Sequence, residues 1–285
     1  MAQIDLPYGG APTSGTQAIL YANSSDKLLH MIDDSAVDLP LVRGSMLGEV
    51  IAAHLAIPSL RGFWPMSAEL NSNDAFWSIP SLVGNRPIRD AASYARGMTA
   101  GLVPYVTMAV ASSQYFYRAD ELGLRGSSAF GGWTWGGWYN FTSLPTAGNV
   151  MALMSKWTSP AANEEYLIQL SNSGGTTYFQ AYVGSGSAAT AITHPTAIAS
   201  INTWYYIVAR WAASSTLDLF VSAVKGSTAC AYATLAGGTA QFQIGAAFGA
   251  NEFIDGSATL CFVAGYPLSD AHIQGLYNIS KTLFP

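Results

Sequence analysis

Short apolar runs separated by polar turns predict a small β-meander at the start of the chain. The runs at 18–21 and 27–32 read as two strands joined by a turn over 23–26, and a second turn at 33–35 precedes a third short strand. A segment of roughly 40 residues buries too little apolar area to be stable alone. We therefore expect residues 1–44 to pack on a partner chain or a larger structure.

The spacing becomes helical after residue 44. Apolar residues recur every three to four positions, at Leu47, Val50, Ile51 and Leu55. Ser45 is a suitable N-cap and Pro58 ends the continuation. The pattern predicts one short helix and a linker over residues 45–61. The helix is either a packing stem or oligomerisation contact, or a lone helix that lies on the main domain. His54 falls on the apolar face, where a packed histidine is favoured over a metal ligand.

From residue 62 onward the pattern is that of β-structure. Short segments rich in Tyr, Trp, Val, Ile and Thr alternate with Gly, Ser and Asn turns at the spacing typical of sandwiches and barrels. Along 204–209 both alternating sets are apolar, so that strand should be covered on both faces. A helical turn over 268–277, capped by Ser269, closes the predicted domain of residues 62–285.

The stretch FGGWTWGGWYNF at 130–141 raises the question of whether its tryptophans bind a ligand or fill a core. Strand alternation puts Trp133 and Trp135 on one face and Trp138 on the other. The adjacent glycines at 136 and 137 leave room for rings from an opposite sheet or for a bulge. We interpret the stretch as a packed strand.

The amino-acid composition limits the kinds of partner that the protein is expected to bind. Half of the 285 residues are hydrophobic, only 10% are charged and the formal net charge is −5. A surface this poor in charge suits a protein buried in an assembly, whereas a neutral β domain working alone is the alternative. The absence of a Lys/Arg cluster argues against nucleic acid and against anionic membranes as partners.

The start of the chain and its cysteines indicate where it folds. MAQIDLPYGG has neither the basic nor the apolar region of a signal peptide, and no apolar run approaches ~20 residues. We expect synthesis in a cytoplasm. Cys230 and Cys261 are then predicted to be buried thiols, with a disulfide as the alternative.

A family resemblance becomes visible in the order of several fragments. ASSQYF, from residue 111, is followed by WTWGGWYNF, VMALMSKW, EYLIQL, NTWYYIVARW, LDLFVSA, FQIGA, EFIDGSAT and LSDAHIQGLYN. This order resembles laminin-G-like, concanavalin A-like lectin domains. The resemblance implies an all-β fold, a concanavalin A-like two-sheet antiparallel jelly-roll sandwich, to which the β-meander and the short helix are added. It implies core positions at Trp133, Trp135, Trp138, Trp204, Phe242 and Ile244. Relatives often have an Asn-Gly turn where this chain has 222–226, so a longer hairpin is expected there.

The N-terminal segment is similar to a small module of bacteriophage tail fibres and other virion surface proteins, in which a Pro/Ser/Gly lead precedes two short strands. The resemblance implies a virion surface protein, either a capsid decoration or a fibre, attached to other virion proteins through residues 1–44. Because many such proteins are trimeric, we expect a homotrimer. A receptor-binding tail fibre or tail tip protein and a cellular carbohydrate-binding or adhesion module are the alternatives.

Concanavalin A-like folds also include glucanases, which carry paired carboxylates along one strand. That spacing is absent: Glu164 and Glu165 are adjacent, and Glu252 and Asp255 lie in a Gly-flanked loop. No Gly-x-Ser-x-Gly elbow is present either. The sequence therefore favours a non-enzymatic protein.

Candidate binding residues follow from the lectin resemblance. A glycan site needs aromatic rings beside polar groups at a loop rim, and Trp157 and Tyr266 are the candidates, with a packing role as the alternative for each. No cofactor is expected, but a rim Ca²⁺ site at Asn251 and Asp255 stays open. The host glycan, if one is bound, is the expected small-molecule partner.

Overall fold

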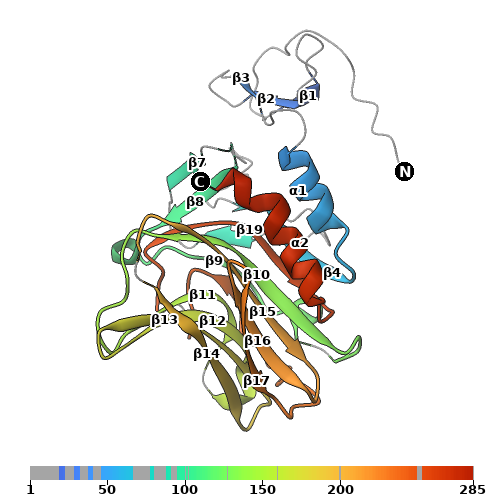
Figure 1. Cartoon of the computed structure of the whole chain (residues 1–285), viewed down its shortest axis with the longest axis vertical. Helices are drawn as coiled ribbons and strands as arrows, with labels where there is room; N and C mark the ends of the chain where they lie inside the picture. The colour runs from blue at the N-terminus through green and yellow to red at the C-terminus, as the bar shows by residue number, and fades with distance from the viewer. Residues whose placement is uncertain are drawn as a thin grey trace.

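Two antiparallel sheets stacked face to face make up most of the chain (Figure 1). The computed structural model describes residues 19–22, 29–32, 38–40, 46–66, 78–79, 88–90, 95–99, 101, 103–126, 128–158, 160–198, 200–248 and 252–284. Among them, no helix is both long enough and apolar enough to cross a membrane. The chain passes back and forth between the sheets, and the predicted concanavalin A-like jelly-roll sandwich is confirmed.

The first sheet carries the tryptophan-rich strand near its middle. Its order is β17-β16-β15-β10-β19-β8-β7, and β4 also pairs with β19. The strands are β4 (Leu60–Trp64), β7 (Ala95–Met98), β8 (Pro104–Met108), β10 (Gly132–Phe141), β15 (Trp204–Ala212), β16 (Thr216–Val221), β17 (Val224–Ala229) and β19 (Gly256–Ala264).

The second sheet has the order β14-β13-β12-β11-β18-β9-β6-β5. Its strands are β5 (Ser78–Ile79), β6 (Ile88–Asp90), β9 (Phe116–Arg118), β11 (Val150–Trp157), β12 (Glu164–Ser173), β13 (Thr176–Gly184), β14 (Ala189–Ile198) and β18 (Phe242–Ile244). Short 3-10 turns occur at Val110–Ser112, Leu122–Leu124, Ala161–Asn163 and Lys281–Leu283.

The N-terminal segment forms the predicted three-stranded antiparallel sheet, β1 (Ile19–Ala22), β2 (Leu29–Ile32) and β3 (Asp38–Pro40). The predicted turns and the Ser45 cap lie outside the described residues. The predicted helix is confirmed as α1 (Met46–Leu55). Because β4 already begins at Leu60 and pairs with β19, the sandwich includes the end of the segment predicted as a linker.

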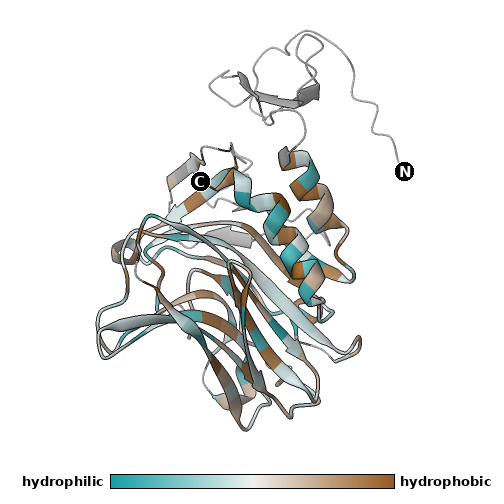
Figure 2. Cartoon of the chain, in the orientation of Figure 1, coloured by the Kyte–Doolittle hydropathy of each residue, from teal (hydrophilic) through white to brown (hydrophobic). Residues whose placement is uncertain are grey.

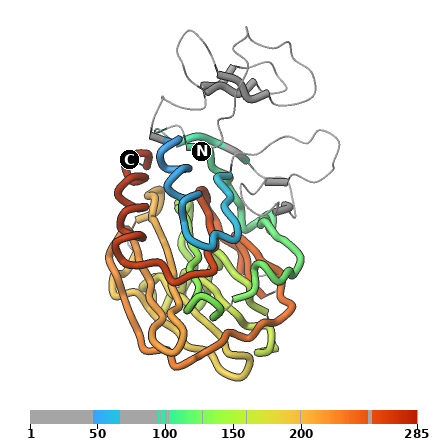
Figure 3. Tube along the Cα trace, turned by 90° about the vertical axis from the view of Figure 1, so that its right-hand side faces the viewer, coloured from blue at the N-terminus to red at the C-terminus, as the bar shows by residue number. Residues whose placement is uncertain are grey.

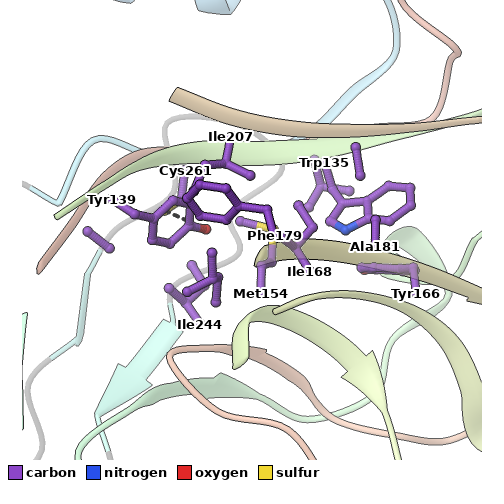
Figure 4. Packing of buried hydrophobic residues seen from close by; sticks show 14 of the residues in the cluster. Trp135, Tyr139, Met154, Tyr166, Ile168, Phe179, Ala181, Ile207, Ile244 and Cys261 are labelled. Carbon is purple, nitrogen blue, oxygen red and sulfur yellow. Dashed lines mark hydrogen bonds between the residues drawn. The ribbon is translucent and has the colours of Figure 1, made fainter. Parts of the chain in front are cut away.

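Aromatic and aliphatic side chains from both sheets fill the space between them (Figure 4). Trp133, Trp135, Phe242 and Ile244 are at most 1% exposed, as the sequence predicts. Cys261 lies in the same core, where its thiol donates to the Tyr139 hydroxyl at 3.7 Å and burial raises the pKa of Cys261 to about 12. Both cysteines of the chain are buried and free, so the disulfide alternative does not hold.

The glycine pair in β10 lies where the neighbouring strands approach closely, as expected for a packed strand. A Cβ atom on Gly136 would lie 2.2 Å from the Ile207 carbonyl oxygen on the next strand, so no side chain fits there. The register with β19 shifts between Gly136 and Trp138, which is the bulge that the glycines permit. Independently of this bulge, strand alternation points Trp135 between the sheets and Trp138 to the outer side.

Two helices cover the outer face of the first sheet (Figures 2 and 3). They are α1 and α2 (Asp270–Ser280), which lie side by side and carry both hydrophobic and hydrophilic bands. Ser269 caps α2 by accepting from the His272 amide at 3.2 Å, as predicted. This helical layer is the second cover that the apolar pattern of β15 requires. Trp204, predicted as a core residue, packs at the margin of the layer and is partly exposed, because it stands at the first position of its strand.

The hairpin between β16 and β17 is shorter than expected. Val221 pairs with Val224, so Ser222 and Ala223 alone make the turn. Both residues have positive φ, 44° and 74°, which is the backbone of a two-residue type I′ turn. The expectation of a longer loop is therefore wrong, because Ser-Ala adopts the turn that Asn-Gly usually forms.

Acid is expected to weaken the contact between α1 and the sandwich through His54. The ring is buried, stacks on Phe63 at 4.9 Å and donates from Nδ1 to the Val50 carbonyl at 2.8 Å, and burial lowers the pKa of His54 to about 4. Since unfolding lets the ring take up a proton, stability should fall as pH drops from about 6.5 to about 4, by roughly 3 kcal/mol. Urea unfolding of wild type and His54→Phe across this range measures the effect. Equal pH slopes in the two proteins would contradict it.

Candidate functional site

A groove of about 600 Å³ lies where β10 ends and β11 begins. Its residues come from four places: the connection between these strands, the start of β11, and two further segments that reach the same end of the sandwich. They are Val110, Ser143, Leu144, Pro145, Thr146, Gly148, Asn149, Val150, Met151, Glu252 and Phe253. The combination of apolar walls with a few polar groups is typical of small-molecule sites.

Hydrogen bonds hold the connection over 142–149 in place. The Ser143 hydroxyl donates to Asp255 Oδ2 at 2.6 Å, and the Thr142 amide donates to the Asp255 carbonyl at 2.9 Å. On the other side, Asn172 Nδ2 donates to the Pro145 carbonyl at 2.7 Å. The connection is thus tied on one side to the residue before β19 and on the other to β12, which gives the groove a preformed wall.

Glu252 combines three unusual features in this groove. Its φ is 58°, in the left-handed region that non-glycine residues rarely adopt, while its carbonyl accepts from the Ala152 amide at 2.7 Å. Its Oε2 atom is buried without a hydrogen-bond partner among the described residues. Burial also raises the pKa of Glu252. Backbone strain and an unpaired buried oxygen at one residue are typical of functional sites.

A polar array on the second sheet lies near this carboxylate. Gln180 accepts from Gln169 Nε2 and from the Tyr182 hydroxyl, each at 3.0 Å, and donates to Thr193 at 2.9 Å. Burial raises the pKa of Tyr182, and the negative charge of Glu252 raises it further. Of this array, Tyr182 is therefore the member that the charge of Glu252 affects.

A row of aromatic rings begins in the groove at Phe253. Phe253 lines the groove and lies 5.9 Å from the Tyr115 ring, which in turn lies 5.8 Å from Tyr117. Ring faces beside hydroxyl, amide and carboxylate groups are the chemistry that sugars require, because a sugar has apolar C–H patches and many hydroxyl groups.

The two aromatic residues predicted as a sugar site are not at this groove. Trp157 is only 4% exposed, because residues after β18, among them Ala247 and Phe248, pack over its ring. Its burial agrees with the packing alternative for this residue. Tyr266 is 41% exposed, but its carbonyl accepts from Thr134 near the start of β10, whereas the groove lies beyond the end of that strand. The two predicted residues thus belong to different surroundings.

The predicted calcium ligands are only partly described. Asn251 lies outside the described residues, and Asp255 accepts from Ser143 and supports the groove wall. Within the described part of the chain, no group of three or more His, Cys, Asp or Glu side chains is arranged to hold a metal ion. The calcium alternative stays a prediction.

The groove is not predicted by the sequence pattern, which places Glu252 in a turn. The available signal was the connection TSLPTAGN at 142–149, a long turn-rich segment between two strongly apolar strands. Glu165, the other carboxylate considered, is fully buried and forms an ion pair with Lys156 at 2.8 Å. It is therefore committed to the interior.

Solved structures similar to this chain share its fold at low identity. The binding domain of Paraclostridial Mosquitocidal Protein 1 has a TM-score of 0.58 and 13% identity, covering 77% of this chain and 52% of that one. The binding domain of botulinum neurotoxin DC, in complex with SialylT, has a TM-score of 0.52 and 10% identity, covering 79% and 52%. This chain thus spans about half the length of these toxin domains.

Domain 4 of AbnA, a GH43 extracellular arabinanase from Geobacillus stearothermophilus in complex with arabinotriose, has a TM-score of 0.54 and 12% identity, covering 77% of this chain and 98% of that one. No curated protein matches the sequence. The family model of the concanavalin A-like lectin/glucanases superfamily, Laminin_G_3, matches residues 113–274, more than half of the chain. The chain therefore belongs to the concanavalin A-like lectin/glucanases superfamily.

Proposed function

We propose that this chain is a non-enzymatic surface protein of a bacteriophage virion and that its lectin-like domain binds a host glycan in the groove lined by Glu252 and Phe253. The observation that carries the glycan-binding proposal is the unpaired, half-buried Glu252 carboxylate in a preformed groove with an aromatic wall. A sugar hydroxyl could donate to the unpaired oxygen once the Glu252 side chain turns this oxygen from its buried position towards the groove.

The same groove supports binding rather than cleavage. Glycoside hydrolysis ordinarily uses two carboxyl groups that flank the scissile bond. Among the described lining residues Glu252 is the sole carboxylate, and the nearby Asp255 is engaged by Ser143. One acceptor and one ring face are sufficient to hold and orient a sugar without reacting with it.

The similar structures are compatible with this proposal. Among them, an arabinanase domain was solved in complex with arabinotriose, and a botulinum neurotoxin binding domain in complex with SialylT. At 12% and 10% identity these likenesses concern the fold. The assignment of a groove in this chain therefore rests on its own residues.

Replacement of Phe253 by alanine is expected to weaken glycan binding at least tenfold, because it removes the ring face against which a sugar would stack. The measurement is a glycan array followed by calorimetric titration of the best ligand. Tyr266→Ala is the matched control, since it also removes a partly exposed ring, near the opposite end of β10. Loss of binding in Tyr266→Ala alone would contradict the groove and favour the rim site. No binding to any glycan at millimolar concentration would contradict the lectin role.

The virion part of the proposal rests on the N-terminal segment and the low charge. A three-stranded sheet of so few residues needs a partner to bury its apolar side chains, and in our proposal other virion proteins provide it, in a homotrimer. Particles that lack the chain should lose either head stability, as for a decoration protein, or adsorption to the host, as for a receptor-binding fibre. Unchanged stability and adsorption would contradict both roles.

A further inference from the structure

We infer that the groove beside Glu252 selects neutral, hydroxyl-rich saccharides and rejects acidic ones such as sialylated or uronic-acid glycans. This inference rests on the proposed glycan-binding function and specifies the ligand class of the same groove. It concerns the charge and the hydrogen-bonding groups that the ligand must offer.

The charge of the lining residues is the first reason to expect selection against acidic sugars. Among its described lining residues Glu252 is ionisable, and no lysine, arginine or histidine is present. An acidic sugar would therefore bring a second negative charge next to a carboxylate, with no cation in the described lining to compensate it. Burial of the site makes such repulsion stronger than it would be in bulk water.

Several cations of the sandwich are committed elsewhere. Lys156 lies 2.8 Å from both Asp120 and Glu165, and Arg125 also pairs with Asp120. On the first sheet, Arg210 forms ion pairs with Asp218 and with Asp270. These side chains are fixed by carboxylates of the protein itself, so a ligand carboxylate would have to compete with an existing ion pair for each of them.

The hydrogen-bonding groups of the groove are the second reason to expect this selectivity. The Ser143 hydroxyl already donates its proton to Asp255, so its oxygen can only accept from a ligand. The Glu252 carboxylate in the lining is likewise only an acceptor when ionised. Two acceptor side chains in the lining of the groove favour a ligand with donors. Neutral sugars offer a hydroxyl proton at nearly every carbon, whereas a carboxylate or sulfate group offers none.

The test uses the full chain and matched pairs of oligosaccharides that differ only by a terminal sialic acid or by oxidation of a hexose to a uronic acid. Neutral members should bind at least tenfold more tightly than their acidic partners at low ionic strength, and the ratio should shrink as salt is added. In Glu252→Gln the ratio should fall towards one, since the variant removes the charge and supplies a donor. Glu49→Gln, an exposed carboxylate on α1, is the control and should keep the wild-type ratio.

The possible outcomes distinguish a failure of the charge selectivity from a failure of the proposed glycan-binding function. Equal or tighter binding of the acidic members would overturn the selectivity while leaving glycan binding intact. An unchanged ratio in Glu252→Gln would show that the selectivity arises outside the groove, and would overturn the inference as well. Absence of binding to all members would instead overturn the proposed function.

Discussion

Replacing Lys156 with methionine is expected to lower the free energy of unfolding by about 3 to 5 kcal/mol. The ammonium group is fully buried and lies 2.8 Å from carboxylate oxygens of both Asp120 and Glu165. It also donates to the carbonyl oxygens of Gly238 and Ala240, at 3.0 and 2.8 Å. Removal of the cation leaves a buried carboxylate without its counter-charge and two carbonyl groups without their donor.

Chemical denaturation of wild type and Lys156→Met at neutral pH measures this loss. Lys281→Met is the control, because Lys281 is exposed and such a change costs about 0 to 1 kcal/mol. Burial already raises the pKa of Glu165, and the attraction of Lys156 opposes that rise. In the variant the pKa of Glu165 should rise further, so its stability should decline more steeply than that of wild type as pH increases above about 4. A loss below 1 kcal/mol would mean that the ion pair barely outweighs its desolvation.

Local pattern was sufficient to predict the strands and the faces they present. Alternation along β10 correctly places Trp135 between the sheets and Trp138 outside them, and a bulge, one of the two roles expected for the glycine pair, is present between β10 and β19. The apolar character of both faces of β15 also predicts a second covering layer. These inferences succeed because side-chain direction in a strand depends on local geometry alone.

The exposure of side chains at strand ends could not be predicted from the local sequence pattern. Trp157 ends β11 before a turn and reads as a rim residue, yet Ala247 and Phe248, some ninety positions later, cover it. The groove has the same origin, since the connection over 142–149 meets Glu252 and Phe253 only after the sandwich has closed. A contact between segments so far apart leaves no trace in the spacing of either one. Burial and ligand sites formed by such contacts therefore need the three-dimensional structure.

The substitution Trp138→Ala is expected to destabilise the protein by about 3 to 5 kcal/mol, through the helical layer rather than through the core between the sheets. The indole is 2% exposed and stacks on the Phe284 ring at a centroid distance of 4.1 Å. Its Nε1 donates to the Ser280 hydroxyl at the end of α2, at 3.1 Å. Truncation would leave a cavity between β10 and the helix and would remove the hydrogen bond that fixes the helix end.

Thermal unfolding and amide hydrogen exchange distinguish a local from a global effect. Trp138→Phe keeps a ring for stacking but loses the donor, so it should recover more than half of the lost stability. In Trp138→Ala, amides of α2 should exchange faster while those of β12 and β13, on the opposite sheet, stay protected relative to global unfolding. Equal acceleration in both regions would mean that the helices and the sandwich unfold as one unit. In that case the helical layer, and not the inter-sheet core alone, would limit the stability of the whole fold.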